Sequence, residues 1–164
     1  MNPDALSDLV LLAACAASAW RVAVVRAAWR GAMLLLGLAA AMGVLRYSGL
    51  EWALGPHRFF SLLAACVAFW LMVAALRWPQ APLARQATAV GRFVVLLGGL
   101  GIAASQVGAA WWAQVVPGLS ALVLAWTMVQ QRSALGLLGS VALVASFVVA
   151  ALAAPDVQLL GMFN

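Results

Sequence analysis

Six long apolar stretches follow one another along almost the whole chain, and they restrict the fold more than any other feature. They cover roughly residues 4–21, 31–48, 57–77, 89–108, 115–131 and 133–154. A helix of about 20 apolar residues is long enough to cross the hydrocarbon core of a bilayer. The stretches are continuous rather than alternating, which disfavours a membrane β-barrel. We therefore predict an all-α, polytopic integral membrane protein with about six transmembrane helices in one bundle, a single domain over residues 1–164.

The composition excludes a water-soluble alternative. Only 8% of the residues are charged and 67% are hydrophobic, whereas a soluble domain carries about a quarter charged residues. All nine basic residues are Arg, and Ala, Gly and Leu are abundant, which is typical of a GC-rich bacterial genome. The Arg residues lie at helix ends rather than in one basic patch, so they indicate membrane topology and no nucleic-acid partner.

The distribution of Arg predicts the orientation. Seven of the nine Arg residues fall in the first, third and fifth connectors, and the positive-inside rule then places both termini outside the cytoplasm of a bacterial inner membrane. The first ten residues contain no basic residue, so we expect the first apolar stretch to be a retained helix rather than a signal peptide. The acids and the only His fall on the outer side, where we define an outer polar cluster: Asp4, Glu51, His57, Arg58 and Asp156.

Two similar segments suggest an internal repeat. Residues 11–20 (LLAACAASAW) resemble residues 62–70 (LLAACVAFW), and the sequence LLG recurs at 35–37, 96–98 and 137–139. This pattern predicts three helix hairpins of the same orientation, a kind of repeat that occurs in carriers. The alternative is chance similarity in a chain dominated by Leu, Ala and Gly. Small residues in several helices predict close helix packing or an oligomer interface.

One buried ion pair is predicted within the membrane. Arg46 lies about 24 Å above Arg30, and Asp8 lies about 20 Å above Arg21, at 1.5 Å per helical residue. A charge at such a depth is costly unless it is paired or reaches the interface. Because the first two helices are sequential neighbours, we predict an Asp8–Arg46 ion pair that clamps them together.

His57 and Glu51 are the candidates for catalysis. His57 follows Pro56, which suits the first turn of the third helix, and a neutral imidazole there could act as a base. A zinc site needs three or four ligands, and the chain has a single His, so we predict no metal site. The sequence identifies no cofactor. Cys15 and Cys66 form no CxxC motif and are expected to be packing residues.

The sequence leaves three functions open. We expect a small, non-enzymatic inner-membrane subunit or carrier-like protein that acts through helix packing and the outer polar cluster. Its partners would be the lipid bilayer and a homo-oligomer or larger membrane complex. One alternative is a membrane-embedded hydrolase, metal-assisted or not, that uses His57 with outer carboxylates. The other is a small oligomeric permease.

Overall fold

The chain folds as a series of helices joined by short connectors. The computed structural model describes residues 3–21, 26–109 and 111–153, and every regular element in these ranges is helical. This confirms the all-α prediction. In chain order the elements are α1 (Pro3–Arg21), α2 (Ala27–Tyr47), the 3-10 helix η1 (Glu51–Ala53), α3 (Leu54–Leu63), the π-helix η2 (Ala64–Ala68), α4 (Phe69–Arg77), α5 (Pro82–Arg85), α6 (Ala87–Gln106), α7 (Trp112–Gln130) and α8 (Ala134–Ala153).

Four helical stretches are long and apolar enough to cross a membrane. They are Pro3–Trp20, Ala27–Tyr47, Glu51–Arg77 and Ala87–Gln106. The third stretch joins η1, α3, η2 and α4 into one continuous rod, which we call the central rod. The described apolar parts of α7 and α8, Val115–Gln130 and Ala134–Ser146, are shorter. The helices are therefore compatible with residence in a membrane, and the count of six spans stays a prediction.

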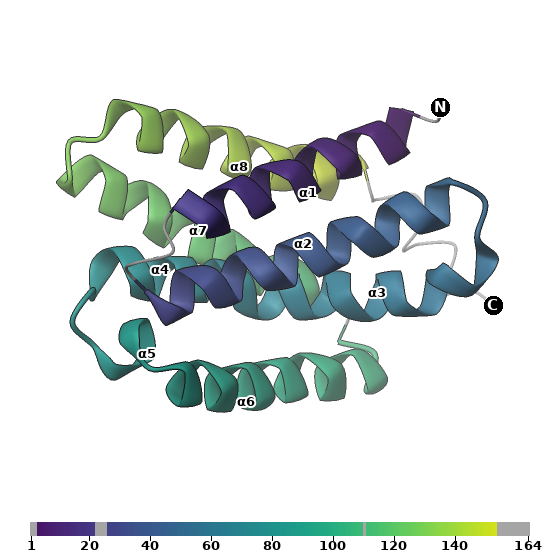
Figure 1. The fold of residues 1–164 in the computed structure, drawn as a ribbon, viewed down its shortest axis with the longest axis horizontal. Coiled ribbons are helices and arrows are strands. Elements are labelled where there is room, and N and C mark those ends of the chain that lie inside the picture. The colour runs from purple at the N-terminus through teal and green to yellow at the C-terminus, as the bar shows by residue number, and fades with distance from the viewer. Residues whose placement is uncertain (1–2, 22–25, 110, 154–164) are drawn as a thin grey trace.

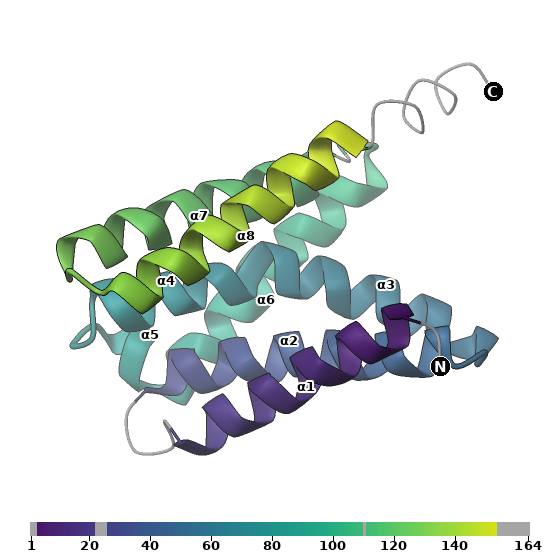
Figure 2. The same cartoon turned by 90° about the horizontal axis from the view of Figure 1, so that it is seen from above.

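The long helices alternate in direction, so their ends gather at two ends of the bundle (Figure 1). These two ends differ in charge. At the first end lie the start of α2, the end of α4, α5, the start of α6 and the turn between α7 and α8 (Figure 2). At the second end lie the start of α1 and the connection from α2 to α3. The acids of the described residues, Asp4, Asp8 and Glu51, belong to the second end. The first end, where α1 also ends, carries seven Arg residues: Arg21, Arg26, Arg30, Arg77, Arg85, Arg92 and Arg132.

The buried core lies between α2 and the central rod. Buried positions of α2 recur every three or four residues, because one face of this helix is turned to its neighbours. Several of these residues are Ala or Gly, which let helix backbones approach closely. The helices α6 and α7 pack on different sides of the central rod, and α1 and α8 lie outermost, on α2 and α7 (Figure 1). The largest fully buried apolar side chains come from the rod: Val67, Leu71 and Val73.

The π-helix η2 is the part of the central rod that receives α6. Cys66 of η2 is fully buried, and Gly101 of α6 lies against it. A Cβ atom on Gly101 would lie 2.7 Å from the Cys66 Sγ and 3.2 Å from its Cβ. At Gly98, one turn earlier, a Cβ would collide with the Leu63 side chain. These two glycines therefore allow α6 to approach the rod.

Side chains from two other segments hold the end of α4. The last four carbonyl groups of a helix have no partner within the helix. Here the Arg26 guanidinium donates a hydrogen bond to the Ala75 carbonyl, and the Gln131 amide donates one to the Leu76 carbonyl at 3.0 Å. The end of α4 is thus tied both to the start of α2 and to the turn between α7 and α8.

The observed start of the third helix differs from the predicted one, and it carries the candidate catalytic residues His57 and Glu51. The third helix was expected to begin at residue 57, but η1 and α3 extend it back to Glu51. Pro56 caused the shorter prediction, since proline suits the first positions of a helix. The structure places Pro56 and His57 in the first turn of α3, which begins at Leu54. His57 therefore lies in the first turn, as predicted, with Glu51 on the preceding 3-10 turn.

Candidate functional site

Three helices meet at Gly43, and they bring the His57 imidazole next to the Asp8 carboxylate. Asp8 comes from α1, Gly43 from α2 and His57 from α3. A Cβ atom on Gly43 would lie 2.8 Å from the Asp8 Cγ and 3.2 Å from the His57 Cε1, and it would collide with the Asp8 Oδ2. The Asp8 carboxylate and the His57 ring therefore share the space that the missing side chain leaves free. We call this arrangement the Asp8–His57 site.

The His57 ring is held by two groups of α2. Its Nδ1 atom lies 3.3 Å from the Ala39 carbonyl oxygen. A carbonyl oxygen only accepts hydrogen bonds, so this contact favours the tautomer with its proton on Nδ1, in which Nε2 is an acceptor. The ring also packs edge-on against Tyr47, with centroids 5.9 Å apart and an interplanar angle of 70°. Both contacts fix the ring orientation on the face of α2.

The charges around Asp8 come from two residues. His57 and Asp4 act on its carboxylate electrostatically, with opposite signs. Asp8 itself is half-buried. A carboxylate within an apolar helix requires a polar neighbour, and here the imidazole of His57 is that neighbour. An acid and an imidazole in this position can share or exchange a proton, and they can also act simply as a polar contact between helices.

The structure places Arg46 next to an aromatic ring. Its guanidinium carbon lies 4.9 Å from the centroid of the Tyr47 ring, a distance typical of a cation–π contact. Asp8 lies over Gly43, about one helical turn from Arg46 along α2. The predicted Asp8–Arg46 ion pair stays a prediction.

The other members of the outer polar cluster lie around this site without joining it. Glu51 and Arg58 are exposed, and among the described side chains no hydrogen bond or ion pair connects either of them to His57. Asp4 is exposed on the first turn of α1 and reaches the site through its charge. Asp156 lies outside the described residues. The candidate pair for catalysis, His57 with Glu51, is therefore not assembled by a described contact.

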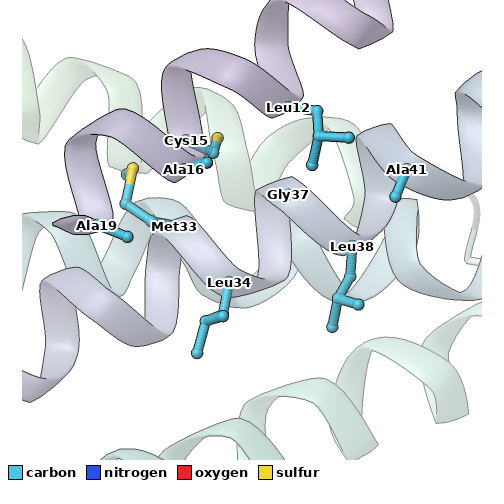
Figure 3. A pocket seen from close by; sticks show the side chains of 9 residues that line it. All are labelled: Leu12, Cys15, Ala16, Ala19, Met33, Leu34, Gly37, Leu38 and Ala41. Atoms are coloured by element: carbon cyan, nitrogen blue, oxygen red, sulfur yellow. The ribbon is translucent and has the colours of Figure 1, made fainter.

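The groove beside this site is apolar. It lies between α1 and α2 and has a volume of about 220 Å³, below the range of about 300–1,000 Å³ for small-molecule sites. Figure 3 shows that only Leu, Ala, Cys, Met and Gly residues line it. In the described part of the chain, no group of three or more His, Cys, Asp or Glu side chains is arranged to hold a metal ion. The groove therefore offers no polar group for substrate chemistry.

The residues missing from the sequence analysis were Gly43 and Ala39. Ala39 contributes only its backbone carbonyl, and no sequence signal reports such a contact. Gly43 did leave a signal, because it lies on the same helix as Arg46 and one turn before it. A glycine in the interior of a helix costs stability relative to alanine, so its presence near a predicted buried acid could have indicated a close contact.

Comparison of the chain with known protein families, with curated proteins and with solved structures finds no match.

Proposed function

We propose that this chain is a small, non-enzymatic subunit of a bacterial inner-membrane assembly, with six spans and both termini on the outer side. One observation carries the proposal. The acid and the imidazole meet at a contact between three helices rather than in a polar cavity. A polar contact of this kind favours a role in helix association, since polar side chains within a bilayer stabilise helix pairs.

The carrier-like part of the proposal is the repeat of three helix hairpins, and it rests on similar contacts in two helix pairs. Cys15 of α1 packs against Gly37 of α2, where a Cβ atom would lie 3.7 Å from the Cys15 Cβ. Cys66 of the central rod packs against Gly101 of α6. The two Cys residues belong to the two similar segments of the sequence, so each of these two segments would contribute a Cys that meets a glycine of the next long helix. This supports three hairpins, with α7 and α8 as the third.

Broad apolar faces support an assembly larger than one chain. Val95 and Leu96 of α6 are 73% and 70% exposed, and Leu135 and Leu138 of α8 are 84% and 67% exposed. These helices lie on different sides of the bundle (Figure 1). Lipid tails or neighbouring chains would cover these faces in a membrane. We propose a homo-oligomer or a larger complex as the functional form.

Replacement of Asp8 or His57 is expected to weaken this assembly. The purified protein should have a mass above that of a 17.1 kDa monomer in mild detergent, measured by light scattering after size exclusion. Asp8→Asn and His57→Ala should shift it to smaller species, because α1 would no longer be held against α2 and α3. The matched variants Glu51→Gln and Arg58→Gln, at exposed positions of the same end, should keep the wild-type mass. A strictly monomeric wild-type protein without a co-purifying partner would contradict the proposal.

A small permease is the second candidate, because a titratable pair within a span often marks an ion pathway. The two functions differ in proton flux. A subunit should leave liposomes as tight to protons as empty ones, measured with a trapped pH-sensitive dye. A flux that disappears in Asp8→Asn would favour the permease.

The proposed orientation predicts different labelling of the two ends. In a background with Cys15→Ala and Cys66→Ala, we expect Glu51→Cys to react with a membrane-impermeant maleimide in intact cells. Arg85→Cys should react only after the membrane is opened. The reason is that seven Arg residues mark the first end as cytoplasmic. Labelling of position 85 from outside would reverse the topology.

A further inference from the structure

The outer face of α6 carries an open groove near the start of the helix, away from the Asp8–His57 site. Five residues of this helix line it, and the space beside them is about 550 Å³, shallow and open to the surroundings. The spacing of these residues places them on one face of the helix, so the groove follows the helix axis. They are Thr88, Gly91, Arg92, Val95 and Leu96.

The groove changes from polar to apolar along its length. Thr88 and Arg92 lie toward the start of α6, and Val95 and Leu96 lie farther into the predicted span. Gly91 keeps the floor open, because a Cβ atom there would meet no other atom within 4 Å. A ligand that fits this order has a polar or charged head and an apolar tail.

The charge at this end of the bundle selects a negative head. Arg92 is exposed, and exposed Arg85 lies on α5, immediately before α6. The acids of the described residues all lie at the second end, so among these residues the first end carries basic charge alone. Arg binds phosphate with a planar, multi-donor guanidinium group, and Thr88 adds a hydroxyl donor one turn away.

The geometry points to a binding site for an anionic phospholipid on α6. Its phosphate lies against Arg92 and Thr88, and one acyl chain follows Gly91, Val95 and Leu96. The net negative charge of the headgroup distinguishes this ligand from a zwitterionic lipid, which carries the same phosphate. The site is independent of the Asp8–His57 contact and of any oligomer.

Native mass spectrometry of the full chain in detergent tests the site with two added lipids. Phosphatidylglycerol is expected to bind about fivefold more tightly than phosphatidylcholine, and Arg92→Gln should remove that preference, because one Arg near an anionic headgroup contributes about that factor. Gly91→Leu should weaken phosphatidylglycerol binding while leaving the charge intact, because it fills the floor of the groove.

Two matched variants distinguish binding at this site from a general electrostatic attraction of anionic lipid to the Arg-rich end of the bundle. Arg132→Gln removes an exposed Arg from the same end, and Gly139→Leu fills an equally open glycine position on α8, on another side of the bundle. Both should bind phosphatidylglycerol like the wild type. Equal binding of the two lipids, equal losses in Arg92→Gln and Arg132→Gln, or unchanged binding in Gly91→Leu would each overturn the site. Size-exclusion profiles confirm that each variant is folded, and Arg92→Gln decides the question if Gly91→Leu is not.

Discussion

Replacing Gly43 by alanine is expected to lower the free energy of unfolding by about 1–3 kcal/mol, the cost typical of an overpacked contact. The added Cβ would lie 2.8 Å from the Asp8 Cγ and 3.2 Å from the His57 Cε1. The Asp8 carboxylate would have to turn away and the His57 ring would have to give by a few tenths of an ångström, so the contact between them would be disturbed. Thermal unfolding in detergent, followed by circular dichroism, measures the loss.

Gly37→Ala is the matched control, since it lies on the same helix and also faces α1. There the Cβ would lie 3.7 Å from Cys15 and Leu12, which is ordinary contact, and the variant should be as stable as the wild type or more stable, by up to about 1 kcal/mol. Asp8→Ala should restore much of the stability lost in Gly43→Ala, because it removes the colliding carboxylate. Additive losses in the double variant would show that the two residues do not meet.

Gly101→Ala is expected to push α6 away from the central rod at a similar cost in stability. Its Cβ would lie 2.7 Å from the Cys66 Sγ. The Cys66 side chain is fully buried, and the new Cβ would also lie 3.2 Å from its Cβ. In a Cys15→Ala background, the displacement should make Cys66 react faster with maleimide, by about tenfold for each 1.4 kcal/mol lost in the protecting contact.

Gly99→Ala controls for the change in helix propensity on α6. No atom lies within 4 Å of a Cβ at Gly99, so this variant should keep Cys66 as protected as in the wild type. Its stability should stay the same or rise, by up to about 1 kcal/mol, because alanine favours helix over glycine. Equal reactivity of Cys66 in Gly101→Ala and Gly99→Ala would refute the close packing of α6.

The helices themselves could be predicted because their signal is long and local. A run of about 20 apolar residues has few other solutions in a bilayer, and α1, α2, the central rod and α6 all coincide with such runs. The exact start of the central rod was harder to predict from the sequence. Residues 51–56 contain Gly and Pro, which usually interrupt helices, yet here the 3-10 turn and the first turn of α3 include them.

The Asp8–His57 site was harder to predict, because it depends on rotation as well as depth. The rise per residue placed Asp8 near the level of Arg46. It gave no information about which face of α2 meets α1, and that face presents Gly43 to Asp8. The π-helix is a second case, since an apolar sequence such as AACVA carries no local signal for a wider turn, which only the packing partners can impose.

The π-helix also determines how α4 is rotated about the axis of the central rod relative to α3. A π turn holds one residue more than the surrounding α-helix would use, and each residue of an α-helix turns the chain by about 100°. Deleting one residue from Ala64–Ala68 would let the segment relax into plain α-helix. All of α4 would then keep nearly its present phase relative to α3, because the removed residue is the extra one that the π turn holds, and buried Leu71 and Val73 would still face the core. The segment should therefore tolerate the loss of one residue, whereas one further residue would turn α4 by about 100° and take Leu71 and Val73 out of the core.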